Sequence, residues 1–208
     1  MTIPSNVTQS LPEAPSRSDL YDHLSLAFSF PDACLYSEIR DGQLTAQLDA
    51  ALSMLPYRLS TSRLSWKIPR TYDDLQSEYI RLFQIGGRNG PPCPLHQGHY
   101  TRDRSQALQN LVRFYNHFGF QTAECVMPDN LAVQLEFMSV LAEGNDRSRL
   151  RAQRDFLAAH LTWTGELAKR VASSRPHPLY RSLTALTATL VEAEGRFLTK
   201  AAEEIEDG

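Results

Sequence analysis

A chain of 208 residues, of which 42% are hydrophobic and 22% charged, can bury one sizeable core, so we expect a single domain. The formal net charge of −3, with basic residues scattered along the chain, provides no basic surface for a nucleic-acid backbone. No stretch approaches the ~18 apolar residues of a membrane span, and the N-terminus lacks the apolar run of a signal peptide. We therefore expect a cytoplasmic protein without stable membrane association.

The N-terminal quarter is predicted to contain a tail followed by two helices. Residues 1–17 mix Pro, Ser and Thr with few apolar side chains, which is typical of a disordered tail. From Ser18, apolar residues recur at helical spacing as far as Phe30, and Pro31 ends the helix because the residue before a proline avoids the α-region. A second helix is predicted over residues 44–55.

The middle of the chain combines a well-marked helix with a long loop. Thr71 and Asp74 have the spacing of a capping box, and the helix that they begin is expected to end at the glycine pair 86–87. Residues 86–95 are rich in Gly and Pro, which excludes regular structure and predicts a loop. Helical periodicity returns over residues 108–119.

Three further helices are predicted in the C-terminal half. Pro128 and Asp129 suit the first turn of a helix, since proline fits that position and a carboxylate favours the positive end of the helix dipole. A long helix is predicted over residues 150–171 and a last one over residues 179–197, from apolar side chains at helical spacing. Residues 201–208 are acidic and are expected to fray.

Every apolar repeat in the sequence has a period near 3.6, and no segment shows the alternation of a strand. We therefore predict an all-α fold, a single-domain bundle of roughly eight to ten helices over residues 18–200. A monomer is the expected state. A domain-swapped dimer is the alternative, because the link at residues 143–147 is short and polar.

Several short motifs resemble the TorD/DmsD/NarJ family of redox enzyme maturation chaperones. They are the run 78–83 (Glu-Tyr-Ile-Arg-Leu-Phe), the loop that ends Cys93-Pro94-Leu95, the pair His99-Tyr100, and the runs 127–131 (Met-Pro-Asp-Asn-Leu) and 135–138 (Leu-Glu-Phe-Met). The form of the loop is most similar to chaperones of the dimethylsulfide, ethylbenzene, selenate and chlorate oxidoreductases. Asn130 departs from the family pattern, which has histidine there and therefore a charge that asparagine cannot carry.

The resemblance implies an all-helical chaperone that has no catalytic activity and no cofactor of its own. Its partner would be the catalytic subunit of a molybdenum oxidoreductase. Members of this family bind the twin-arginine leader of such a subunit and hold the apo-subunit until its molybdenum cofactor is inserted, which prevents premature export. An acidic group near an apolar groove would suit such a leader, because carboxylates form charge-assisted hydrogen bonds with arginine.

The peptide-binding residues that the resemblance implies come from the two motif regions. They are Tyr79, Leu82, Phe83, Pro92, Cys93, Pro94, Leu95, His99, Tyr100, Pro128, Asp129, Asn130 and Glu136. Two simpler interpretations stay open. The apolar residues are equally suited to a core, where large side chains at helical spacing usually lie. Asp129 is equally suited to capping its helix, and Glu136 to a solvated surface.

A metal site is the main alternative for the loop. Cys93, His96 and His99 could supply three zinc ligands, but no fourth ligand is near in the sequence, so we predict no metal. Cys34 and Cys125 are remote from it, and all three cysteines are interpreted as reduced thiols. A small helical metal- or nucleotide-binding enzyme, or a helical regulator without leader binding, remains the alternative function. No phosphate-binding glycine loop, nucleophile elbow or His-Glu-x-x-His helix supports an enzyme.

Overall fold

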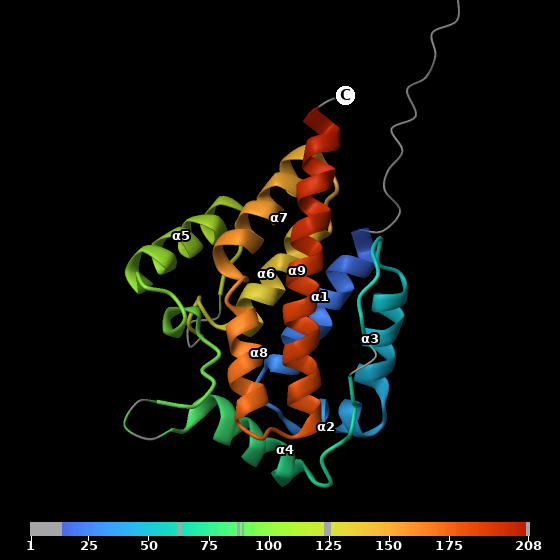
Figure 1. The fold of residues 1–208 in the computed structure, drawn as a ribbon, viewed down its shortest axis with the longest axis vertical. Helices are drawn as coiled ribbons and strands as arrows, with labels where there is room; N and C mark the ends of the chain where they lie inside the picture. Colours follow the sequence, from blue (N-terminus) through green and yellow to red (C-terminus); the bar gives the residue numbers. More distant parts are fainter. Residues whose placement is uncertain (1–13, 62–63, 87, 89, 123–125, 207–208) are drawn as a thin grey trace, which may run out of the picture.

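The computed structural model describes residues 14–61, 64–86, 88, 90–122 and 126–206. Within these residues it contains nine α-helices and no strand, which confirms the predicted all-α fold (Figure 1). No helix in this part of the chain is both long and apolar enough to cross a membrane. The α-helices are α1 (Ala14–Phe28), α2 (Ala33–Arg40), α3 (Gln43–Ser53), α4 (Tyr72–Tyr79), α5 (Arg104–His117), α6 (Leu131–Ala142), α7 (Arg147–His160), α8 (Thr164–Ser173) and α9 (Pro178–Glu206).

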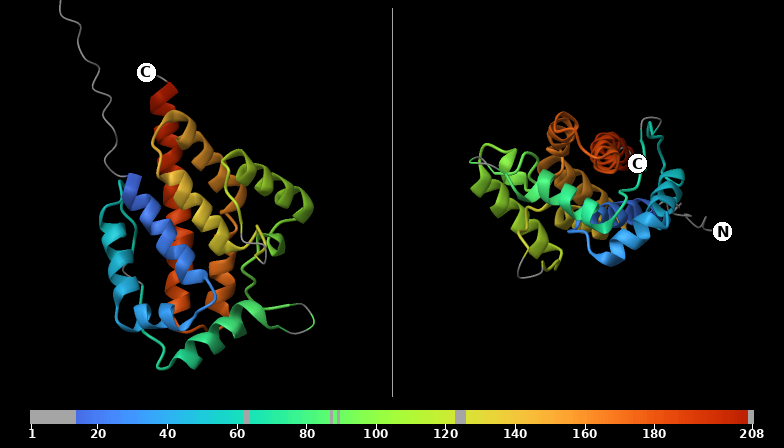
Figure 2. Two further views of the ribbon diagram at one scale, coloured as in Figure 1. Left: turned by 180° about the vertical axis from the view of Figure 1, so that it is seen from behind. Right: turned by 90° about the horizontal axis from the view of Figure 1, so that it is seen from below.

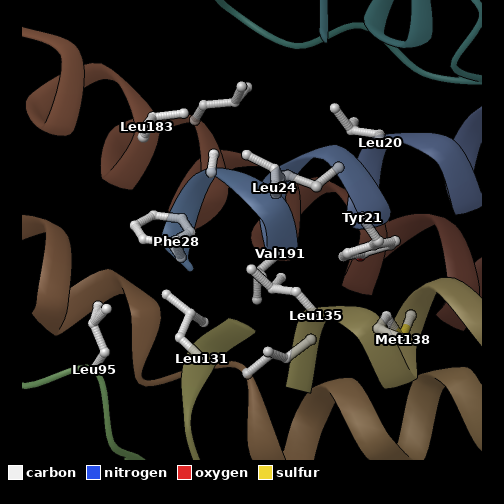
Figure 3. Close-up of a cluster of buried hydrophobic side chains, with 14 of the residues drawn as sticks. Leu20, Tyr21, Leu24, Phe28, Leu95, Leu131, Leu135, Met138, Leu183 and Val191 are labelled. Atoms are coloured by element: carbon white, nitrogen blue, oxygen red, sulfur yellow. The ribbon is translucent and has the colours of Figure 1, made fainter. Parts of the chain in front are cut away.

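Helices α1 and α6 form the centre of the bundle and run antiparallel. Figure 3 shows Phe28 of α1 beside Leu131 of α6, and Tyr21 of α1 beside Met138 of α6. All four side chains are fully buried. Helix α9 runs beside α7 and α8, while α5 and the pair α2–α3 lie on opposite sides of the bundle (Figures 1 and 2). Because burial of each large apolar side chain contributes about 1.5–3 kcal/mol, these contacts hold α6 against α1.

Helix α1 is anchored at its start by a buried ion pair. Arg17 Nε donates to Glu194 Oε1 of α9 at 2.8 Å, and the guanidinium also contacts Gln153 of α7. Tyr57 donates its hydroxyl hydrogen to the other oxygen of Glu194. Arg17 and Glu194 are 1% and 0% exposed. The predicted boundary at Ser18 is therefore wrong, because a residue assigned to the tail is part of the core; residues 1–13 lie outside the described part.

Other helix boundaries also differ from the sequence-based predictions. Helix α1 ends at Phe28 rather than Phe30, and the short helix α2 was not predicted. Its start is capped by Asp32, whose side chain accepts from Leu35 N at 2.8 Å. The last helix extends through residues 201–206, which were expected to fray; Ala201 and Ala202 are buried there.

The helix predicted over residues 150–171 is two helices, α7 and α8. The break lies at Leu161 to Trp163, where side chains donate hydrogen bonds to backbone carbonyl oxygens. Trp163 Nε1 donates to His160 O at 2.8 Å, and Thr164 Oγ1 donates to Leu161 O at 2.8 Å. Polar side chains that bond to nearby carbonyls compete with the helical ladder, and apolar spacing does not reveal such a break.

Candidate functional site

The two motif regions meet where the loop 91–100 lies against the start of α6. An isolated antiparallel bridge pairs His96 with Asn130. Gln97 N donates to Asp129 O at 2.9 Å, and Leu131 N donates to Leu95 O at 2.8 Å. The loop therefore has a fixed backbone register against residues 129–131, although no strand pairing was predicted for it.

The side chain of Asp129 holds this loop in place through contacts with Gly98 and His96. Its carboxylate accepts from Gly98 N at 3.1 Å and contacts His96 Nδ1 at 3.1 Å, and the residue is 3% exposed. Burial alone would raise the pKa of Asp129, but the hydrogen bonds from His96 and the Gly98 amide lower it below its usual value. Both oxygens of this buried carboxylate therefore already have partners within the protein.

Asn130, rather than Asp129, caps helix α6. Its side chain accepts from Ala132 N at 2.9 Å, and the helix begins at Leu131. The prediction that Pro128 and Asp129 open the helix is therefore wrong by two residues. Asparagine is among the best N-cap residues, so this departure from the family histidine has a structural use.

Behind the loop lies a buried network of neutral polar side chains, which we call the amide–imidazole network: Gln97, Gln134, His160 and Trp163. Gln97 Oε1 accepts from Gln134 Nε2 at 2.7 Å and lies 3.1 Å from His160 Nδ1. Trp163 Nε1 lies 3.1 Å from Gln134 Oε1. This network connects the loop to α6, α7 and the α7–α8 turn through hydrogen bonds. No sequence pattern predicted it.

Burial lowers the pKa of His160 to about 4, so its imidazole is neutral at pH 7. Since Gln97 Oε1 can only accept, His160 Nδ1 carries the proton in this contact. His160 Nε2 is buried and has no hydrogen-bond partner among the described residues. An added proton on this ring would have no acceptor at that nitrogen.

The aromatic motif of α4 belongs to the core. Tyr79, Leu82 and Phe83 are at most 5% exposed, and the Phe83 ring lies 5.3 Å from that of Tyr180 in α9. A π-helix, η1 (Ile80–Gln84), carries the last two of these residues. Because these side chains are buried, they do not form an open groove in this structure. They are core residues.

The remaining predicted site residues divide by exposure. Cys93, Pro94 and Leu95 are buried and pack the loop onto the bundle. Tyr100, Pro128 and Asn130 are half-buried; Tyr100 donates to Pro94 O at 2.9 Å. Pro92, His99 and Glu136 are exposed. The structure thus brings the loop and residues 128–130 together, and leaves Glu136 further along α6.

The predicted cysteine–histidine cluster does not assemble. Cys93 Sγ lies 3.4 Å from Ser174 Oγ, whereas His96 faces Asp129. Among the residues the structure describes, no group of three His, Cys, Asp or Glu side chains is close enough to hold a metal ion. Cys34 is an exposed free thiol and Cys93 a buried one; Cys125 lies outside the described residues.

A mixed acidic and apolar surface on the outside of α1 and α6 was not predicted. We call it the α1–α6 face: Asp22, Leu26, Phe30, Ala132 and Glu136. Ser25 Oγ donates to Ala132 O at 2.8 Å, which places the two helices side by side here. Leu26 is 38% and Phe30 46% exposed. Burial and the nearby charge of Asp22 raise the pKa of Glu136.

Asp22 and Leu26 lie four residues apart, which is the spacing of one stripe along α1, whereas Phe30 lies beyond the end of α1 and its ring is 5.5 Å from that of Tyr79. That spacing is the sequence signal that could have identified the outer side of α1. It was missed because only the spacing of Leu20, Leu24, Ala27 and Phe28 was used to predict this helix. The two carboxylates repel each other, so a cation placed between them would be stabilised.

The fold places this protein in the class of all-helical bundles, here with a loop held against a central helix. Comparisons with known proteins show its family. Residues 41–169 match the nitrate reductase delta subunit family. The selenate reductase assembly chaperone protein of Thauera selenatis is 30% identical over 74% of this chain and 76% of its own length. The chlorate reductase assembly chaperone protein of Ideonella dechloratans is 28% identical over the same shares.

A solved structure from Archaeoglobus fulgidus, assigned as a redox enzyme maturation protein, has the same fold. It superposes with a TM-score of 0.51 at 24% identity, covering 88% of this chain and 93% of that one. The chain belongs to the nitrate reductase delta subunit family, the group of TorD/DmsD/NarJ proteins that the motifs indicated.

Proposed function

We propose that this protein is an assembly chaperone for the catalytic subunit of a molybdenum oxidoreductase, and that it binds the twin-arginine leader of that subunit in the cytoplasm. The observation that carries the proposal is membership of a family whose similar members are named assembly chaperones of selenate, perchlorate and chlorate reductases. One further relative is named a nitrate reductase molybdenum cofactor assembly chaperone. Asp129 is buried and hydrogen-bonded within the protein, so it gives no support to a catalytic role.

The α1–α6 face is the surface that we assign to the leader. A twin-arginine leader joins two adjacent cations to an apolar stretch. The exposed Leu26 and Phe30 would meet the apolar stretch, and Asp22 with Glu136 would meet the cations. Among the described residues, neither carboxylate side chain forms an ion pair within the protein, so neither must give up a partner.

This assignment moves the binding surface away from the aromatic motif of α4. Binding across Tyr79, Leu82 and Phe83 would require opening of the core, since exposing one buried Phe forfeits about 1.5–3 kcal/mol. The exposed and half-buried residues of the loop, Pro92, His99 and Tyr100, remain candidates for leader contact, but Tyr100 stacks on Trp163 and lies beneath Arg170 of α8 rather than on the α1–α6 face. Asn130 and Pro128 lie between the loop and α6.

Calorimetric titration of a synthetic twin-arginine leader into the full chain tests the proposal. We expect saturable binding that weakens about tenfold in Leu26→Ser, because that side chain would lose roughly 1.4 kcal/mol of apolar contact. Val112→Ser is the matched control: Val112 lies on α5 and is 37% exposed, against 38% for Leu26. Equal weakening in both variants would contradict the assigned surface, and absence of binding to the folded wild type would contradict the proposed function.

A further inference from the structure

A second feature of the surface lies where α4 passes beneath the α8–α9 turn (Figure 1). A cavity of about 480 Å³ opens there. We call it the basic cavity; its lining includes Lys67, Arg70, Glu78, Arg81, Arg175 and His177. Its volume lies within the range of pockets that hold small molecules. None of the leader-binding residues proposed above lines it.

One wall of the basic cavity is held in place by the protein itself. Arg81 donates to both oxygens of Glu78, at 2.8 and 2.9 Å, and Glu78 also accepts from His177 N at 2.6 Å. Arg81 further donates to Ser174 O at 3.2 Å, at the end of α8. Burial would raise the pKa of Glu78, but these hydrogen bonds lower it, so the carboxylate is ionised and fully engaged.

The other cations of the cavity are not engaged in this way. Lys67 and Arg70 come from the link before α4, and Arg175 from the α8–α9 turn. Within the described part of the chain, none of these three side chains forms an ion pair. The second carboxylate of the lining, Asp74, accepts from Thr71 N in the capping box of α4. The cavity therefore has an excess of positive charge.

Arg175 has a backbone conformation that a side chain disfavours. Its φ is +50°, and among the described residues it is the only non-glycine with positive φ. It follows the C-cap residue of α8, Ser174, a position at which helices usually place glycine because glycine has no Cβ to clash. An arginine here costs stability, and Arg175 is among the residues that line the cavity.

We propose that the basic cavity binds a small phosphate-bearing anion. The three cations without ion-pair partners line one cavity from two separate segments, so a ligand that presents oxygen atoms in several directions would suit them. A phosphate group does this, while a carboxylate offers two oxygens in one plane. Arginine forks match phosphate geometry well. The apolar residues Ile68, Pro69 and Pro176 in the lining would contact an organic part of the ligand.

Titration calorimetry with inorganic pyrophosphate on the full chain tests this site. Arg175→Gly is the informative variant, because it removes the guanidinium and relieves the positive φ at once. We expect a melting temperature above that of the wild type, together with affinity for pyrophosphate lower by about ten- to hundredfold, the loss expected for a hydrogen bond to a charged group. A variant that is more stable yet binds more weakly cannot owe the loss to unfolding.

Two comparisons separate a specific site from general charge effects. Arg113→Ala removes an exposed cation on α5, far from the cavity in sequence, and should leave the affinity unchanged. Citrate, which carries carboxylates, should bind more weakly than pyrophosphate. The proposal is overturned if pyrophosphate shows no saturable binding, if Arg113→Ala weakens binding as much as Arg175→Gly, or if an Asp/Glu-rich peptide binds the cavity and pyrophosphate does not.

Discussion

Two buried polar clusters tie the helices of this protein together, and they differ in charge. At the start of α1, Arg17 and Glu194 form an ion pair with almost no exposure. Behind the loop, the amide–imidazole network joins neutral groups. The first depends on both charges being present, because a lone buried charge is very costly. The second depends on one imidazole staying neutral, so it responds to pH instead.

The largest effect should follow from removing one charge of the ion pair. Glu194→Gln leaves Arg17 buried without a carboxylate, and we expect the free energy of unfolding to fall by about 3–5 kcal/mol. Urea denaturation followed by circular dichroism measures it. The paired variant Arg17→Met with Glu194→Leu should recover most of the loss, because it removes both charges. A cost below about 1 kcal/mol for Glu194→Gln would mean that the pair is hydrated.

The amide–imidazole network should give a smaller effect that depends on pH. The pKa of His160 is lowered to about 4 in the folded protein, so the unfolded state binds the proton more readily. The stabilising contribution of neutral His160 is thus complete above the unfolded pKa of about 6.5, and falls by roughly 3 kcal/mol as the pH drops to about 4.

Comparison of wild type with His160→Gln isolates this contribution. Glutamine does not titrate and can still donate to Gln97, so the difference in unfolding free energy between the two proteins should shrink between pH 6.5 and 4. Urea titrations at a series of pH values measure that difference. A gap that stays constant over this range would show that His160 titrates normally in the folded state.

The two clusters also mark how far the sequence predicts this structure. Local signals were sufficient for α4. In its capping box, the side chains of Thr71 and Asp74 each accept a hydrogen bond from the other residue's backbone N–H. The partner of Arg17 lies 177 residues away in the chain, and no local pattern links the two. For that reason the start of α1 was placed too late, and a buried arginine was assigned to a tail.

For the candidate site, the sequence identified the right segments and assigned some roles wrongly. The Gly/Pro loop and residues 128–130 do meet, as their shared resemblance suggested. Whether Tyr79 and Phe83 face a groove or a core depends on the packing of α9, which helical spacing does not report. The exposed side of α1 was overlooked because apolar spacing predicts the helix but does not show that Leu26 and Phe30 stay exposed.

Asp129 combines features of both clusters and should give the smallest of the three effects. It is a buried carboxylate like Glu194, but it accepts a hydrogen bond from the Gly98 amide and contacts the partly exposed His96 instead of an arginine. Asp129→Asn keeps an acceptor for Gly98 N and loses only the charge. We expect a loss of about 1–2 kcal/mol at pH 7 with unchanged helix content, because charge-assisted hydrogen bonds are replaced by weaker neutral ones.

The pH dependence of Asp129→Asn separates a loop-holding role from a ligand-binding one. Since the folded pKa of Asp129 lies below its usual value, its stabilising effect is present above the unfolded pKa and disappears as the pH falls through the folded one. The difference in unfolding free energy between wild type and variant should therefore vanish in acid, at a lower pH than the change expected for His160. Leader affinity at pH 7 should change little, since Asp129 is 3% exposed and already hydrogen-bonded. A large loss of affinity with unchanged stability would instead place Asp129 in direct contact with the leader.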